Sequence, residues 1–140
     1  MAVGTGILAK NIVLAYSAVP ATTYTDLADL QEIPDIGGTM DKVEVTTLAD
    51  SGRRYINGLV DYGDLTFKFL YDNSSATASY RVLAAMNGAL KTWKITLPDL
   101  TTFVFTGYPS LKIDSAGVNA PLTYTLSINL NSAMTVTNPA

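Results

Sequence analysis

The sequence contains neither cysteine nor histidine among its 140 residues. Without cysteine there is no disulfide, no thiolate nucleophile and no cysteine-ligated metal. Without histidine, Ser-His-Asp catalysis and histidine-ligated zinc are also excluded. A general base would have to be Asp or Glu, and we find no P-loop, dinucleotide fingerprint or G-x-S-x-G elbow. We therefore expect a protein that is not an enzyme and that binds no cofactor or metal.

Charged residues are scarce as well. They make up 15% of the chain, whereas about 25% is typical. This deficit favours a surface that other subunits partly cover, although a β domain rich in Thr and Ser would show it too. The net charge of −3 disfavours gripping nucleic acid, because phosphate binding needs clustered Lys and Arg. It is compatible with a surface past which DNA slides.

Long apolar runs are missing too. No stretch approaches the ~18 consecutive apolar residues of a membrane span, so no membrane insertion is expected. The first twenty residues lack a positively charged start, and Lys10 and Asn11 interrupt their apolar part. We interpret this segment as mature chain rather than a signal peptide, which makes the cytoplasm the expected place of synthesis.

Period-two alternation dominates the rest of the chain. It is clearest in residues 64–71, 91–97 and 121–130, where apolar and polar side chains would face opposite sides of a sheet. Shorter strands are expected at 101–108 and 111–115. Trp93 lies in such a strand, so we expect it in the core, with a sugar-binding platform as the alternative.

One segment changes period. Residues 75–90 are rich in Ala, with apolar residues at spacings of three and four, which predicts one amphipathic helix. The tally is seven or eight short strands and one helix. We predict a single mainly β domain, a β-sandwich or barrel with a flanking helix at about residues 75–90. A flexible N-terminal arm (1–11) and a C-terminal arm (131–140) would flank it.

Two pairs of carboxylates are the remaining candidates for chemistry. Asp61 and Asp64 flank Tyr62-Gly63 and could serve acid–base work or bind Ca²⁺. Asp and Gly are also preferred turn residues, and we favour a turn that opens the next strand. Asp26 and Asp29 are expected to be solvated.

The stretch between two predicted strands, about residues 47–63, is unusually long and apolar for a loop. Loops longer than ~12–15 residues are uncommon and are usually functional or disordered. Its aromatic and aliphatic residues argue against disorder. We expect an assembly loop whose contact residues are Asp50, Arg53, Arg54, Tyr55, Ile56 and Leu59. The arginines would pair with carboxylates on the same or a facing subunit.

The segments Glu44-Val45-Thr46, Tyr55-Ile56-Asn57-Gly58-Leu59 and Asp61 to Phe67 decide the family. With the helix and the closing alternating strand, they resemble the tail tube (major tail) proteins of long-tailed, non-contractile bacteriophages. The resemblance implies a structural virion protein in the tail, with six-subunit rings stacked into a hollow tube for DNA delivery. The long loop would reach the adjacent ring.

The same resemblance implies the partners. These are further copies of the chain, tape-measure and tail terminator or tip proteins, and genomic DNA passing transiently and without sequence specificity through the lumen. Two alternatives stay open. One is a tail terminator or the tube protein of a contractile, secretion-type machine. The other is a carbohydrate-binding β-sandwich, which the exposure of Trp93 would support.

Overall fold

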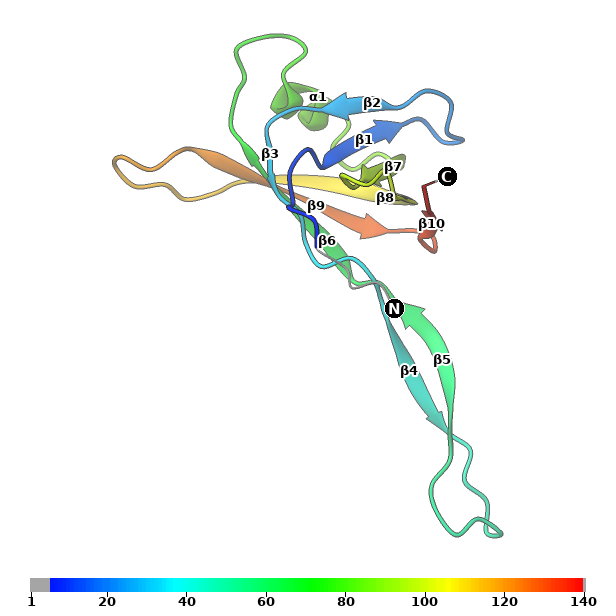
Figure 1. Ribbon diagram of the computed structural model, residues 1–140. Coiled ribbons are helices and arrows are strands. Elements are labelled where there is room, and N and C mark those ends of the chain that lie inside the picture. The colour runs from blue at the N-terminus through cyan, green and yellow to red at the C-terminus, as the bar shows by residue number, and fades with distance from the viewer. Residues whose placement is uncertain (1–5, 140) are drawn as a thin grey trace.

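A computed structural model describes residues 6–139, which form ten strands and one short helix. Seven strands follow one another in the main sheet in the order β2-β1-β7-β8-β9-β6-β3, and β10 pairs with β8. The two remaining strands, β4 and β5, pair only with each other and project away from the body (Figure 1). The bounds are β1 Val13–Ser17, β2 Thr25–Leu27, β3 Leu30–Glu32, β4 Thr39–Glu44, β5 Tyr55–Asp61, β6 Asp64–Leu70, α1 Ser79–Ala85, β7 Lys91–Thr96, β8 Thr102–Ile113, β9 Thr123–Leu130 and β10 Thr135–Thr137.

The alternating strands build the core, as the period of two predicts. On β6, Leu65, Phe67 and Phe69 are buried, while the residues between them face outward. Their partners on β9 are Ile128, Leu126 and Tyr124, which lie directly opposite in the register and are also buried. Cross-strand neighbours on one face of a sheet pack against each other. The mainly β fold class is therefore confirmed.

Trp93 lies in the core, as expected. Its side chain is fully buried, and its indole Nε1–H donates a hydrogen bond to the carbonyl oxygen of Gly107 at 3.2 Å. A sugar-binding platform needs an exposed ring face, so Trp93 does not supply one.

The flanking helix is shorter than predicted. It spans Ser79–Ala85 instead of about residues 75–90. Ser79, at its start, uses its Oγ to bind the backbone of Ala28, accepting from N–H at 2.8 Å and donating to C=O at 2.9 Å. The helix is thus fixed to the connection between β2 and β3. It ends before Gly88, whose φ of 81° lies in the left-handed region that glycine tolerates.

Two predicted strands, 101–108 and 111–115, are one long strand, β8. Pro109 lies in its middle, although proline is rarely found inside a paired strand. The carbonyl of Pro109 accepts from the N–H of Gly88, so its nitrogen also faces away from β9. The missing N–H therefore costs no bond in the β8–β9 ladder.

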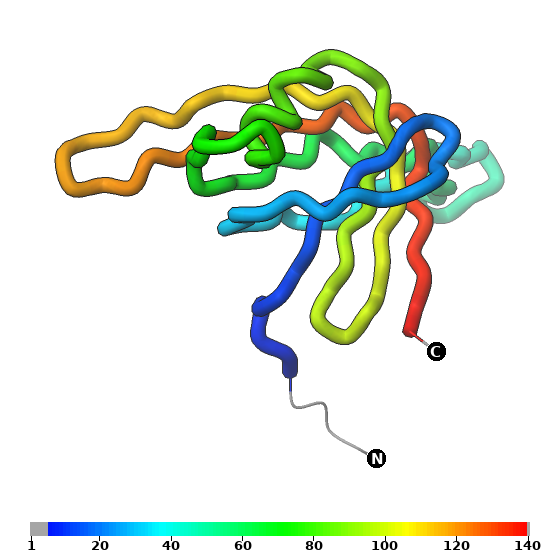
Figure 2. Tube along the Cα trace, turned by 90° about the horizontal axis from the view of Figure 1, so that it is seen from above, coloured from blue at the N-terminus to red at the C-terminus, as the bar shows by residue number. Residues whose placement is uncertain are grey.

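The first and last described segments, residues 6–12 and β10, lie on one side of the body. Residues 6–12 contain no strand, the turn between β7 and β8 reaches out beside them, and β10 runs the same way (Figure 2). Part of the predicted C-terminal arm, 131–140, is therefore strand: β10 pairs with β8, with Val136 opposite Phe103. Residues 1–5 of the predicted N-terminal arm, and residue 140, lie outside the described residues.

Candidate functional site

The segment predicted as a loop at about residues 47–63 is a loop only in part, because residues 55–61 form one arm of a β-hairpin. β5 pairs antiparallel with β4, with Met40 opposite Val60 and Val43 opposite Ile56. Only residues 45–54 connect the two strands without strand structure. The loop prediction was wrong for residues 55–61, because β4 supplies a hydrogen-bonded partner strand for them. We call residues 39–61 the projecting hairpin.

The projecting hairpin carries apolar side chains on both faces. Directly opposed residues of an antiparallel pair point to the same face, and residues an odd number apart along a strand point to opposite faces. Met40 and Val60 therefore share one face, and Val43 and Ile56 share the other. All four are exposed, as is Leu59 with 87% of its surface accessible. Within residues 6–139, neither face is covered by the body of the chain.

A register shift gives Leu59 its exposure. The pairing steps from Met40 to Lys42 on β4, but from Val60 to Asn57 on β5. Such a bulge places two residues of one strand opposite one residue of the other and bends the ribbon. Gly58 lies at this point, where an added Cβ would come within 3.2 Å of the backbone oxygen of Asp41. Leu59 is left without a cross-strand partner.

The apex of the projecting hairpin is organised by Asp50. Its carboxylate accepts from the backbone N–H of Thr47 at 2.7 Å and from Nε of Arg54 at 3.0 Å. Arg54 in turn donates its backbone N–H to Oγ1 of Thr46. The Thr47 N–H and the Arg54 guanidinium hold the pKa of Asp50 below its usual value, because both favour the charged form.

Both arginines have carboxylate partners on their own hairpin. Arg54 pairs with Asp50, and Nε of Arg53 lies 3.9 Å from Glu44. The Arg53–Glu44 contact is long and its groups are exposed, so it leaves Arg53 available to another partner. Lys42 lies over the ring of Tyr55, 5.8 Å from its centroid.

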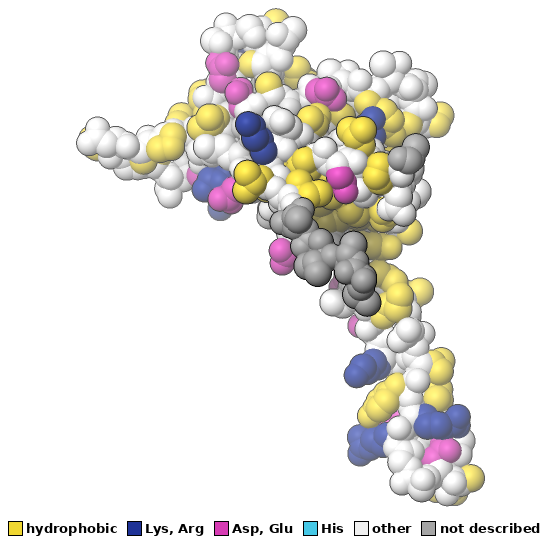
Figure 3. Space-filling model, in the orientation of Figure 1, with side chains coloured by type: hydrophobic (Ala, Val, Ile, Leu, Met, Phe, Trp, Pro, Cys, Tyr) yellow, Lys and Arg dark blue, Asp and Glu magenta, His cyan; other side chains and the backbone are white. Residues whose placement is uncertain are grey.

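All six predicted contact residues lie on the projecting hairpin, between positions 50 and 59. The sequence reading missed the apolar residues Met40, Val43, Leu48 and Val60, which the structure exposes beside them. Apolar side chains and Lys or Arg alternate along this arm (Figure 3). Residues 39–44 follow a mixed pattern without a single apolar face, so the sequence did not mark Met40 and Val43 as contact residues.

The acidic pair at the hairpin root forms a turn, as we favoured. Asp61 Oδ1 accepts from the N–H of Gly63 at 2.9 Å, and Gly63 has a φ of 64°. Between this turn and the end of β9 lies a groove of about 580 Å³. In the part of the chain that the structure describes, no three acidic side chains cluster in a way that could hold a metal. Within residues 6–139, no helix is long and apolar enough to cross a membrane.

A second surface is the outward face of β6, β9 and β8. Thr66, Ser127 and Ser110 stand side by side across it, and so do Lys68, Thr125 and Lys112. Asp114 lies at its end and accepts from the hydroxyls of Thr125 at 2.7 Å and Thr123 at 2.8 Å. These bonds, with smaller effects of the two lysines, lower the pKa of Asp114.

The family follows from comparison with known proteins. A family model described as "Phage tail tube protein, TTP" matches residues 11–139. The chain belongs to the phage tail tube protein family. No curated protein gives a match. As a tail tube protein the chain is a structural component of a virion tail, and its family is one of structural proteins.

Solved structures share the tail tube fold at low sequence identity. A chain from the anti-feeding prophage baseplate, a six-fold symmetrised structure, is 17% identical with a TM-score of 0.74, covering 97% of this chain and 98% of its own. A chain from the tail of an empty gene transfer agent particle, refined with C6 symmetry, is 15% identical with a TM-score of 0.71, covering 94% and 99%. A chain from the cap that terminates the anti-feeding prophage tube is 13% identical with a TM-score of 0.76, covering 99% and 95%.

Proposed function

We propose that six copies of this tail tube protein close into a ring, and that rings stack into a hollow tube through which DNA leaves the virion. The observation that carries this proposal is the projecting hairpin, which exposes apolar side chains on both faces. An isolated two-stranded hairpin is only marginally stable in water. Contact with neighbouring copies on both faces would remove this surface from water and hold the hairpin in place.

The hairpin suits a contact between rings. It leaves the body in one direction (Figure 1), so its contact joins two different surfaces of two copies. Such head-to-tail contacts close when they run around a ring and stay open when they run along an axis, which gives a filament. Asp50, Arg53, Arg54, Tyr55, Ile56 and Leu59 belong to this contact. The six-fold symmetry of two of the structural relatives supports the ring size.

The outward face of β6, β9 and β8 suits the lumen. It is lined by Ser and Thr hydroxyls, and its two lysines are balanced by acids. Asp114 lies close enough to Lys68 and Lys112 to feel their charge, and Glu32 lies opposite Lys68 in the register. Fixed cations without such neighbours would hold phosphate and slow the passage of DNA. The tape-measure protein would occupy the same channel before ejection.

Lys94, the other lysine on a polar strand face, has a different partner. Its Nζ lies 4.4 Å from the centroid of the Tyr24 ring. The face of an aromatic ring attracts a cation, so the Tyr24 ring partly offsets the charge of Lys94. We infer that Lys94 belongs to the body and contributes no free charge to the lumen.

Removal of the hairpin tests the proposal. Thr39 and Asp61 are the last opposed pair at its root, so residues 40–60 can be replaced by Asn-Gly, which favours a two-residue β-turn. Wild-type protein, made in bacterial cytoplasm and concentrated, should form tubes visible by negative-stain electron microscopy. The shortened variant should keep the melting temperature of the body and form no tubes. Tubes of normal length from this variant would contradict the assignment of the hairpin.

A tail terminator, or the tube protein of a contractile machine, is the second candidate. Its support is the fold shared with the anti-feeding prophage cap and with a chain from a contractile injection system sheath/tube terminator, at a TM-score of 0.75. Polymer form discriminates the two, because a terminator stops at one ring. Single rings at every protein concentration would favour the terminator.

A further inference from the structure

The apex of the projecting hairpin presents one large apolar side chain. Leu48 is fully exposed, although Thr46, Thr47, Asp50 and Ser51 around it are polar. The Asp50 carboxylate fixes the backbone of this turn through Thr47 and Arg54. An ordered turn that holds a leucine in water loses the free energy of its burial, about 1.5–3 kcal/mol. This arrangement indicates a surface that is covered in the assembled protein.

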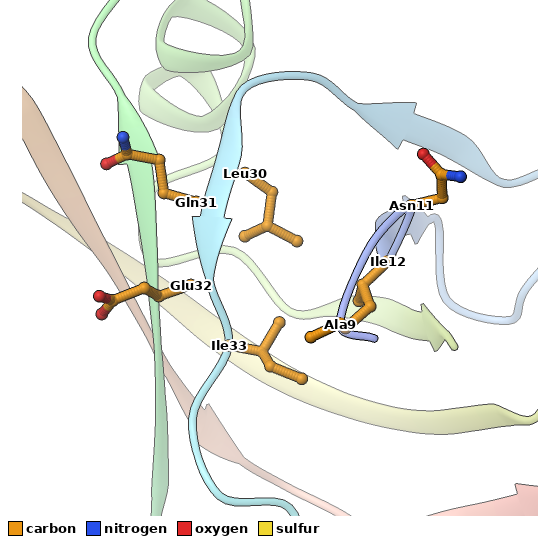
Figure 4. Close-up of a pocket in the computed structure, with 7 residues that line it drawn as sticks. All are labelled: Ala9, Asn11, Ile12, Leu30, Gln31, Glu32 and Ile33. Carbon is orange, nitrogen blue, oxygen red and sulfur yellow. The ribbon is translucent and has the colours of Figure 1, made fainter. Parts of the chain in front are cut away.

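The body carries an apolar groove, which suits an apolar side chain such as that of Leu48. It has a volume of about 330 Å³ and lies between residues 9–12 and residues 30–33. In Figure 4 the side chains of Leu30 and Ile33 point toward those of Ile12 and Ala9, whereas Gln31 and Glu32 point away. Ile12, Leu30 and Ile33 are partly buried against the hydrophobic core, which holds these three side chains in place.

The groove has room for a branched aliphatic side chain. A cavity of about 150 Å³ lined by aliphatic residues holds a benzene molecule, and this groove is larger. The side chain that enters would gain contacts with walls that are already ordered, so little conformational entropy is lost on the receiving side.

The two surfaces also have opposite charge. The two walls of the groove and their flanks, residues 9–12 and 26–35, carry Asp26, Asp29, Glu32 and Asp35 against Lys10, which is a net charge of −3. The apex, residues 45–54, carries Arg53 and Arg54 against Asp50, which is a net charge of +1. Complementary charge steers association and fixes register. The hairpin points away from the body (Figure 1), so its apex does not reach the groove of its own copy.

We infer that Leu48 of one copy inserts into the groove between residues 9–12 and 30–33 of a second copy. The contact joins two different surfaces and therefore repeats along the tube. This inference rests on the proposed function, since it names the receiving surface for the hairpin. It predicts that the axial contact depends on one apolar side chain at the apex and on the walls of one groove.

A cross-link tests the contact directly, because the chain contains no other cysteine. Leu48 and Ala9 are both exposed, so the double variant L48C/A9C should fold normally. A disulfide needs Cα atoms no more than about 7 Å apart. Mild oxidation of assembled protein should give a ladder of covalent oligomers on a non-reducing gel. L48C alone, A9C alone and L48C/S115C, with its second cysteine on the distant β8–β9 loop, should give no ladder.

Two substitutions at the apex give an independent test. Burial of a leucine raises an association constant about 30-fold. L48D should therefore raise the critical concentration for tube formation by at least the same factor. L48M keeps the apolar volume and should polymerise nearly as the wild type does. The monomer should melt at the same temperature in all three proteins, because Leu48 packs against nothing in the body.

The outcomes separate the two proposals. Tubes of the L48C/A9C variant that give no ladder on oxidation, or tubes that tolerate L48D, would overturn the groove assignment and leave the tube proposal standing. Wild-type protein that never forms rings or tubes, even with other tail proteins present, would overturn the proposed function and this inference with it. A ladder in assembled tubes, together with loss of assembly in L48D, would support both.

Discussion

Truncating Ile56 and Leu59 to alanine should weaken polymerisation without unfolding the protein. These two side chains leave 54% and 87% of their surface exposed on the projecting hairpin. Full burial of such a side chain is worth about 1.5–3 kcal/mol, so the exposed fractions together represent roughly 2–4 kcal/mol per copy in the assembled tube. Each 1.4 kcal/mol is a factor of about ten in the association constant, which predicts a rise in critical concentration of roughly 30- to 1000-fold.

The assay is sedimentation of tubes across a concentration series, with electron microscopy of the pellets. Melting of the monomer is measured in parallel. The body should melt within about 2 °C of the wild type, because neither β4 nor β5 pairs with the main sheet.

Two controls separate interface loss from local unfolding of the hairpin. Leu59 has no cross-strand partner in the register, so L59A removes interface area without weakening the β4–β5 pair and should account for more than half of the effect. L100A truncates an exposed leucine outside the hairpin and should leave polymerisation unchanged. An unchanged critical concentration for I56A/L59A would refute the reasoning, and so would an equal rise in L100A.

Three further predictions concern the body. The folded protein holds the pKa of Asp114 below the ordinary value of 3.8. The Asp114 carboxylate therefore stabilises the fold above pH 3.8, and this stabilisation is lost as pH falls through the folded-state pKa. The difference in melting temperature between wild type and D114N should shrink from about pH 6 to about pH 3. In G107A the new Cβ would lie 2.6 Å from Cγ2 of Ile128, which should lower the free energy of unfolding, measured by chemical denaturation, by about 1–3 kcal/mol. In the control G117A the new Cβ would have no atom within 4 Å, so the free energy of unfolding should stay unchanged. The buried Tyr124 hydroxyl has no hydrogen-bond partner among the described residues, so Y124F should leave the melting temperature unchanged or raise it by a few degrees; a clear loss would reveal a partner.

The apolar core was predictable because its signal is local. Leu65, Phe67 and Phe69 alternate with outward-facing residues on one strand, and one buried face is sufficient to produce that pattern. Trp93 could be placed in the core for the same reason. The family could also be recognised from short segments at 44–67, since they preserve the order of strand, apolar insertion and strand.

The projecting hairpin was not predictable in the same way. Its strands face solvent on both sides in the single chain, so Met40, Val43, Ile56 and Val60 follow no pattern with one apolar face. The stretch at about residues 47–63 was predicted as one loop, and only the pairing of residues 39–44 with 55–61 made its second half a strand. The helix begins only at Ser79, whose side chain bonds to the backbone of Ala28, 51 residues away.

The sequence by itself determined which classes of chemistry are excluded, the mainly β fold and the family, because these depend on composition and on periods of a few residues. Tertiary structure decided which surfaces remain open. The pairing of distant segments covers one face of the main sheet and leaves the projecting hairpin, its apical Leu48 and the groove at residues 9–12 and 30–33 uncovered. Burial depends on what packs against a residue from elsewhere in the chain, so only the folded structure could distinguish an internal apolar residue from one available to another copy.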